Sequence, residues 1–227
     1  GINLIDIGAS GNLDRKWKPV ESMVNLVAFD PNEEECRRLS AEPTKFRSAT
    51  YLPYAVGGED ADATLYKTES IYCYTLLQPN SPWLRRFTFG DLFEVKGTES
   101  IPVRRFGDID ELTDFDVDVI KTDSQGLDLQ ILSNAGSLLD RVFYIETETG
   151  FVENCVGETT YAQIDEFMRA HDFLLFDLGA HHRVPRRNRM SHRRSGREQI
   201  LWCESVWLKD YISLARKGQP LHLDRCK

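Results

Sequence analysis

Residues 4–12 of the chain read LIDIGASGN. The apolar run Ile2–Ile7, interrupted only by Asn3 and Asp6, leads directly into a turn of small residues that starts at Gly8. Because glycine has no Cβ, the backbone of such a turn can bend sharply and come close to a bound molecule. The pattern therefore predicts a strand that delivers its backbone to a ligand.

An acidic residue stands at the end of the next predicted strand. Residues 25–29 form a second apolar run, and Asp30 follows it, 22 positions after Gly8. An acid at the tip of a neighbouring strand is typical of nucleotide sites in which a carboxylate binds the ribose. The glycine turn and Asp30 together predict such a site, whereas the turn alone would be a weak indication.

The composition limits the classes of protein to which the chain can belong. Its 227 residues, 41% hydrophobic and 28% charged, are ordinary for one α/β domain that spans residues 1–227. The net charge of −8 argues against nonspecific binding of nucleic acid by the protein as a whole. No apolar stretch approaches the roughly 18 residues that span a bilayer, and no signal-peptide pattern is present, so we expect no membrane association.

Two further features concern processing and redox state. The chain opens without a methionine and almost directly in a strand, so we expect that upstream residues have been lost or trimmed. The five cysteines are scattered and form no C-x-x-C pair. Reduced thiols in a cytosolic protein are the simplest interpretation, so we predict a cytoplasmic location, no disulfide framework and no metal site.

Extended and helical patterns alternate along the chain. Beyond the first strand, extended segments are predicted at 25–30, 46–56, 101–106, 117–120, 142–145 (a strand that ends in Glu146), 173–178 and 200–206, with an extra hairpin strand at 63–68. Helical segments are predicted within 12–23, from Pro31 onward, at 127–136, at Tyr161–Ala170 and at 209–217. This alternation predicts an α/β fold with a mostly parallel sheet and helices on both faces.

Two segments do not follow this alternation. Residues 70–95 are rich in Tyr, Phe and Trp without a clean period, which is typical of a loop or short helix over a pocket, although an aromatic satellite core explains any one ring equally well. Residues 179–198 form a predicted arginine-rich loop between two strands. It is either a solvated connector or a lid that binds a phosphorylated or carboxylated acceptor. Its candidate substrate-binding residues are Arg186, Arg187, Arg193 and Arg194.

Ligands of open α/β sheets bind beyond the carboxyl ends of the strands. The polar residues that the predicted elements place there are Asp6, Ser10, Asp30, Asn32, Lys121, Asp123, Ser124, Gln125 and Glu146. Burying a charge without a partner is costly, so this concentration of charges indicates a site. Lys121 has an alternative role, a structural ion pair with Asp123 or Glu146.

Two classes of cofactor could use the glycine turn. A dinucleotide oxidoreductase would require a G-x-G-x-x-G pattern, of which Gly8 and Gly11 are only a part, with Asp14 where a third glycine would stand. The chain also lacks any Tyr-x-x-x-Lys pair. Asp6, a carboxylate inside the first strand, would repel a pyrophosphate but suits the cationic sulfonium and amino groups of S-adenosylmethionine.

Five segments, in chain order, resemble the FkbM family of S-adenosylmethionine-dependent methyltransferases: LIDIGASGN, VAFDPN, LPYAVGG, VIKTDSQGLDLQIL and FYIETE. The resemblance extends from about residue 2 to residue 208, and its most specific part is the stretch 121–128. It implies a Rossmann-like class I methyltransferase fold with a seven-stranded sheet. It also implies methylation of hydroxyl oxygens on sugars or secondary metabolites.

The resemblance implies roles for individual residues. Asp6, Gly8, Ala9 and Ser10 would hold the methionine part of the cofactor, and Asp30 the ribose hydroxyls. Asn32 would lie near the adenosine, and Ala55 and Val56 beside the adenine. Lys121, Asp123 and Gln125 would stand near the transferring methyl group. Pro31 and Ser124 complete the set of cofactor-binding residues, to which Asp123 and Gln125 also belong. Asn12 departs from the family pattern, where a further glycine is common, and Asp128 stands in place of a glutamate.

The predicted reaction is O-methylation of a small-molecule or glycan acceptor, which would be anionic if the arginines bind it. Its catalytic residues would be Lys121, Asp123 and Glu146, with one of the two acids as general base and Lys121 orienting it. The main alternative is a noncatalytic binding module whose arginine-rich loop docks an anionic partner or RNA. A third, the nicotinamide oxidoreductase, is made improbable by Asp6.

Overall fold

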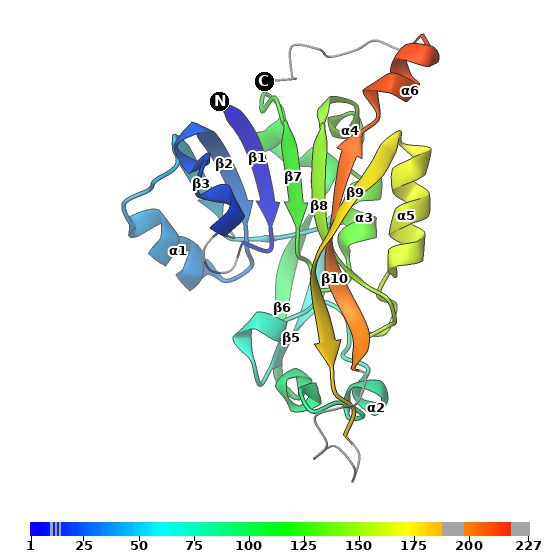
Figure 1. Ribbon diagram of the computed structural model, residues 1–227. Coiled ribbons are helices and arrows are strands. Elements are labelled where there is room, and N and C mark those ends of the chain that lie inside the picture. The colour runs from blue at the N-terminus through cyan, green and yellow to red at the C-terminus, as the bar shows by residue number, and fades with distance from the viewer. Residues whose placement is uncertain (10, 12, 14, 188–197, 219–227) are drawn as a thin grey trace.

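The computed structural model describes all residues except 10, 12, 14, 188–197 and 219–227. A central sheet runs through the molecule (Figure 1) in the order β3-β2-β1-β7-β8-β10-β9. Its strands are β1 (Ile2–Ile7), β2 (Val24–Phe29), β3 (Ser48–Leu52), β7 (Val119–Thr122), β8 (Tyr144–Gly150), β9 (Phe173–Val184) and β10 (Gln199–Lys209). β10 is antiparallel to both of its neighbours, whereas β3, β2, β1, β7 and β8 are parallel. The predicted α/β fold with a mostly parallel sheet is confirmed, and the sheet is mixed.

Three helices pack together on one face of this sheet. The helices are α1 (Glu33–Ala41), α2 (Ser81–Leu84), α3 (Asp128–Ser133), α4 (Leu138–Arg141), α5 (Tyr161–Ala170) and α6 (Tyr211–Arg216). The largest core cluster joins apolar residues of α3, α4 and α5 to one face of the central strands. On the opposite face, the core contains Trp17, from the 3-10 turn η1 (Arg15–Trp17), packed edge-on against Tyr144. The helix expected within 12–23 is thus reduced to two 3-10 turns, η1 and η2 (Glu21–Met23).

A second, three-stranded sheet lies beyond the carboxyl ends of β1 and β7 (Figure 1). It consists of β4 (Ala55–Gly57), β5 (Ala61–Thr68) and β6 (Val95–Arg105), in the order β4-β6-β5. β5 and β6 are antiparallel, but they are no tight hairpin, because residues 69–94 separate them and contain η3 (Ile71–Cys73), α2 and η4 (Gly90–Phe93). Two short 3-10 turns, η5 (Phe106–Asp108) and η6 (Asp110–Leu112), lead back to the central sheet.

Two strands are longer than the sequence suggests. β8 continues past Glu146 to Gly150, so the expectation that the strand ends at Glu146 is wrong. β9 likewise continues to Val184, so the first part of the expected loop 179–198 is strand. The reason is β10, which pairs along both strands and satisfies backbone groups that a loop would leave to water. Residues 188–197 of that segment lie outside the described part of the chain.

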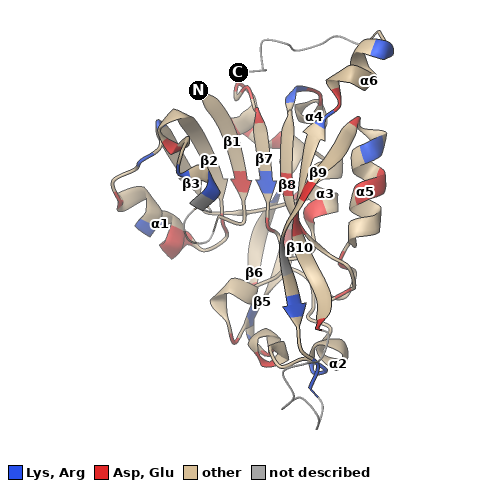
Figure 2. Ribbon diagram, viewed as in Figure 1, with Lys and Arg blue, Asp and Glu red and all other residues tan. Residues whose placement is uncertain are grey.

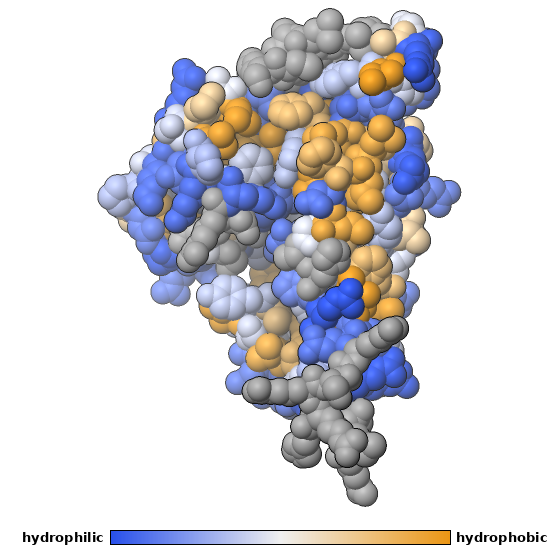
Figure 3. All heavy atoms as spheres, viewed as in Figure 1, coloured by the Kyte–Doolittle hydropathy of each residue, from blue (hydrophilic) through white to orange (hydrophobic). Residues whose placement is uncertain are grey.

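An apolar region is visible on the surface of the central sheet. Leu174 and Phe176 of β9 are 48% and 70% exposed, and orange atoms are prominent over the upper part of β8, β9 and β10 in Figure 3. Within the described ranges, no helix is both long enough and apolar enough to cross a membrane.

Candidate active site

Two adjoining cavities lie at the carboxyl ends of the central strands. The first, of about 800 Å³, lies between these ends and the second sheet. The predicted cofactor-binding residues that line it are Gly8, Asp30, Pro31, Asn32, Ala55, Val56, Asp123, Ser124 and Gln125. The second cavity has a volume of about 480 Å³. Tyr72, Asp123 and Gln125 line both cavities and so form their common wall.

The turn after β1 requires glycine at position 8. Gly8 has a positive φ of 82°, and a Cβ built there would lie 2.0 Å from the carbonyl oxygen of Asp123. The backbone N–H of Asp123 in turn donates to the carbonyl of Ile7, with N and O 2.8 Å apart. The glycine turn and the segment after β7 therefore touch through their main chains, which brings Asp123 to the first cavity.

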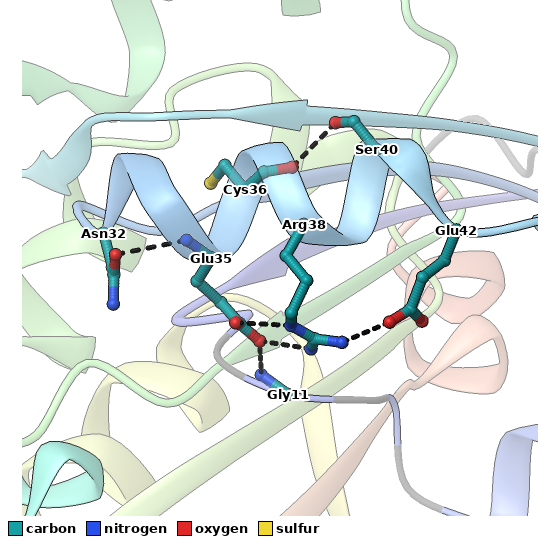
Figure 4. Close-up of polar contacts among 7 residues, drawn as sticks. All are labelled: Gly11, Asn32, Glu35, Cys36, Arg38, Ser40 and Glu42. Carbon is teal, nitrogen blue, oxygen red and sulfur yellow. Dashed lines mark hydrogen bonds and ion pairs between the residues drawn. The ribbon is translucent and has the colours of Figure 1, made fainter.

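The N–H groups of this turn are already bonded within the protein. Those of Gly8 and Ala9 both donate to the carbonyl of Phe29, at N–O distances of 2.9 and 3.1 Å. Gly11 donates to Glu35 Oε1 of α1 at 3.1 Å (Figure 4). Ser10 and Asn12 lie outside the described residues. A phosphate-binding turn must offer its N–H groups to the ligand, and these three do not.

Asp30 follows β2 and is 6% exposed. Its Oδ1 accepts a hydrogen bond from the backbone N–H of Asn32 at 2.8 Å. Burial raises the pKa of Asp30 to about 6, against the lowering effect of that hydrogen bond, and the charges of Glu35, Asp6 and Asp123 raise it further. The carboxylate lines the first cavity, where hydroxyl donors of a ligand would stabilise its charged form.

Asp6, Lys121 and Glu146 are neighbours in one row across β1, β7 and β8. Acidic and basic positions lie side by side on β1 and β7 in Figure 2. Lys121 Nζ is 2.9 Å from Asp6 Oδ1, so Asp6 is its ion-pair partner. The sequence analysis expected Asp123 or Glu146 as the partner, and that expectation is wrong. Burial has the largest single effect and would lower the pKa of Lys121, but the charges of Asp6, Asp123 and Glu146 and the hydrogen bond to Asp6 together outweigh it, and the pKa is raised. None of the three is among the residues that line the two cavities.

Glu146 is held by groups outside the cavities. Lys16, next to Trp17 in η1, forms an ion pair with Glu146 at 2.7 Å, and the hydroxyl of Tyr144 donates to Glu146 at 3.1 Å. The carboxylate therefore connects β8 to the segment that follows the glycine turn. Ala9, also predicted to bind the cofactor, is buried beside Trp17 in the same core cluster and does not line the cavities.

Glu148 is a site residue that the sequence analysis missed. It lies on β8 and lines the second cavity together with Asp123, whose Oδ1 accepts a hydrogen bond from Gln125 at 3.1 Å. Burial, and then the charge of Asp123, raise the pKa of Glu148 well above its usual value. The sequence could have identified Glu148, because residues two apart on a strand share a face and Glu148 is two residues beyond Glu146. The early end assigned to this strand concealed it.

Rings from distant parts of the chain form the walls of the second cavity. Phe89 and Phe93 come from the aromatic-rich stretch, and His182 and Trp202 from β9 and β10. His182 is stacked on Trp202 with ring centroids 4.8 Å apart, and Phe89 packs against Trp202 at 5.3 Å. Both expectations for residues 70–95 therefore apply, because Phe89 also packs against a small core cluster around Phe87.

The described arginines of the candidate loop bond to the protein itself. Arg186 donates to Gln199 Oε1, with Nε and Oε1 3.0 Å apart. Arg187 donates from Nε to the carbonyl of Phe87 at 2.8 Å and pairs with Asp91. Neither lines the two cavities. Arg193 and Arg194 lie outside the described residues.

A comparison with protein-family models matches residues 14–175 to the family described as the methyltransferase FkbM domain. The chain belongs to the FkbM methyltransferase family. Searches of curated proteins and of solved structures returned no significant match. The FkbM match begins after the glycine turn, so the assignment of residues 4–12 rests on their contacts with Phe29, Glu35 and Asp123.

Proposed function

We propose that this FkbM family member transfers a methyl group from S-adenosylmethionine to a hydroxyl oxygen of its acceptor. The cofactor assignment rests on the hydrogen bonds that the N–H groups of the glycine turn make within the protein. Gly8, Ala9 and Gly11 donate to Phe29 and Glu35, and the carboxylate of Glu35 stands beside the turn. Such a turn repels a pyrophosphate but accommodates a nucleoside whose other end is a cationic amino acid.

The residues of the first cavity fit this cofactor. Asp30 offers a carboxylate acceptor for the two ribose hydroxyls. Ala55 and Val56 of β4 are buried apolar residues whose surfaces suit the face of an adenine ring. Ser124 and Gln125 also line this cavity, and Gln125 belongs to the common wall. The fit supports S-adenosylmethionine over a dinucleotide.

The common wall supports Asp123 as the group that receives the acceptor's proton. When bound, S-adenosylmethionine supplies an electrophilic methyl group on sulfur. Asp123 lines both cavities, so its carboxylate is available to a hydroxyl that approaches the methyl group from the second cavity. Gln125, bonded to Asp123 Oδ1, orients that carboxylate.

We assign Lys121 and Glu146 to positioning rather than to proton transfer. Lys121 neutralises Asp6 beneath the glycine turn, and Glu146 holds Lys16. The noncatalytic binding module finds less support, because Arg186 and Arg187 are bonded to Gln199, Phe87 and Asp91.

The cofactor assignment is tested by calorimetry with S-adenosylmethionine. We expect the wild-type chain to bind, and Asp30→Ala to lose affinity by about tenfold or more, since a hydrogen bond to a charged group is worth about 1.5–3 kcal/mol. The control is Asp114→Ala, an exposed aspartate that does not line the cavities. Failure of the wild-type chain to bind S-adenosylmethionine would reject the proposal, and unchanged binding by Asp30→Ala would reject the ribose contact.

A further inference from the structure

The second cavity shares a wall with the first, and this inference rests on the methyltransferase function proposed above. We propose that the second cavity is the acceptor site and that it takes an uncharged alcohol with an apolar body, not an anion. This reverses the expectation that arginines select a phosphorylated or carboxylated acceptor.

The position of the cavity makes it the acceptor site. Tyr72, Asp123 and Gln125 are the residues that the two linings share. Methyl transfer needs the acceptor oxygen, the methyl carbon and sulfur in line within a few ångströms. A molecule in the second cavity therefore borders the same three residues as a ligand of the first cavity.

The charges of the cavity disfavour an anion. Asp123, Glu148 and Glu158 all line it, whereas Arg183 is the only lysine or arginine among its described lining residues, and Arg183 is exposed. Burial raises the pKa of Glu158 to about 7, even though the N–H groups of Asn154 and Cys155 donate to its carboxylate. The pKa of Glu148 is raised as well. An anionic acceptor would enter a region that is already unfavourable for negative charge.

The walls favour an apolar body. Leu92, Phe93 and Trp202 supply apolar surface, and about 480 Å³ is enough for a small ring system. The rings do not form an open cage for an ammonium group, because His182 is stacked on Trp202, and Phe89 packs against Phe87 and Phe93. The raised pKa values of Glu148 and Glu158 mean that these carboxyl groups tend to hold a proton. Such groups suit a hydroxyl group better than a cationic group of the acceptor.

Glu148 completes the proton balance of the reaction. Transfer breaks the cofactor's sulfur–methyl bond, forms the oxygen–methyl bond and releases the hydroxyl proton. Glu148 and Asp123 both line the second cavity, and Asp123 belongs to the common wall, so the pair receives that proton. Before the reaction, the two carboxyl groups share one proton and carry one negative charge between them. The hydroxyl proton of the acceptor neutralises that charge.

Three probes of similar shape and different charge test the proposal. They are para-methylbenzyl alcohol, para-(aminomethyl)benzyl alcohol and para-(hydroxymethyl)benzoate, titrated by ligand-detected NMR into the full chain with and without saturating S-adenosylhomocysteine. We expect the uncharged alcohol to bind. We expect the affinity of the benzoate to be lower by about tenfold or by a larger factor. Equal or tighter binding of either charged probe, or no binding of the uncharged alcohol up to its solubility limit, overturns the proposal.

Variants locate the binding. Glu148→Gln should reduce the difference in affinity between the uncharged alcohol and the benzoate. Glu153→Gln should leave that difference unchanged, because Glu153 is exposed and does not line the cavity. Leu92→Ser should weaken binding of the uncharged alcohol, and Leu92 is 45% exposed, so its replacement should not disturb the fold. If the affinity difference between the two probes is the same in Glu148→Gln as in the wild-type chain, the proposal is contradicted.

The two proposals fail separately. If the chain binds no S-adenosylmethionine but shows the expected order of probe affinities, the proposed function falls and the chemistry assigned to the cavity stands. If it binds S-adenosylmethionine and the expected order is absent, only the acceptor proposal falls.

Discussion

Glu35 of α1 accepts a hydrogen bond from the backbone N–H of Gly11, with Oε1 and N 3.1 Å apart. Arg38, one turn later, donates to both oxygens of Glu35 at 2.6 and 2.8 Å (Figure 4). The helix begins beside the first cavity, because Asn32 caps it and donates its own N–H to Asp30, and both residues line that cavity. α1 is therefore bonded to both parts of the predicted nucleotide site, the glycine turn and the acid.

This relationship predicts that Glu35→Ala weakens cofactor binding from outside the cavity. Loss of a charge-assisted hydrogen bond that positions the turn should reduce the affinity for S-adenosylmethionine about fivefold to twentyfold. Glu166→Ala is the control, since Glu166 is an exposed glutamate on α5 that does not line either cavity. Calorimetry on both variants measures the effect, and equal affinities would show that Glu35 does not position the turn.

Position 8 should not tolerate alanine. In Gly8→Ala, the positive φ and the contact of the new Cβ with Asp123 should cost about 1–3 kcal/mol of stability and abolish measurable cofactor binding. Gly97→Ala in β6 is the control, because a Cβ there would meet no atom within 4 Å. Denaturant unfolding and calorimetry give the two quantities. A Gly8→Ala variant that binds like the wild type would contradict the close approach to Asp123.

The buried pair of Lys121 and Asp6 predicts non-additive stability changes. Lys121→Met leaves Asp6 buried beside an apolar side chain and should cost about 3–5 kcal/mol. Asp6→Asn combined with Lys121→Met should recover part of this loss, because no uncompensated charge remains. A double-mutant cycle by urea unfolding measures the coupling. Additive losses would indicate that the two side chains do not stabilise each other.

Asp128 should make the free energy of unfolding depend on pH. Burial raises the pKa of Asp128 to about 6 from 3.8, so the folded state binds more protons than the unfolded state between these two values. Stability from this group is therefore present below pH 4 and is lost as the pH rises to about 6, by about 3 kcal/mol. Asp128→Asn cannot ionise and should show a smaller decrease.

Urea unfolding at several pH values tests the role of Asp128, with Asp114→Asn, an exposed aspartate, as control. The difference between wild type and Asp128→Asn isolates this group from others that titrate in the same range. Parallel pH profiles for the two proteins would contradict the raised pKa.

The first cavity could largely be predicted from the sequence, because its parts are local. A glycine turn after an apolar run and an acid after the next run identify their positions by strand order alone. Lys121 was expected just after a strand at 117–120, whereas β7 extends to Thr122 and contains it. Its partner Asp6 lies 115 positions away, and only the register of β1 and β7 joins them.

The second cavity could not be predicted in the same way. Its walls combine residues 72–93 with β9 and β10, so their proximity depends on tertiary packing. Glu148 was missed because the length of β8 is set by pairing with β10, more than fifty positions later, and not by the local apolar pattern.

One wall of three residues, Tyr72, Asp123 and Gln125, serves both cavities. A ligand in one cavity that orders or shifts this wall changes the free energy of binding in the other. By thermodynamic linkage, the acceptor must then alter the affinity for the cofactor by the same factor that the cofactor alters the affinity for the acceptor. The wall thus gives the protein a means to make the binding of its two substrates cooperative.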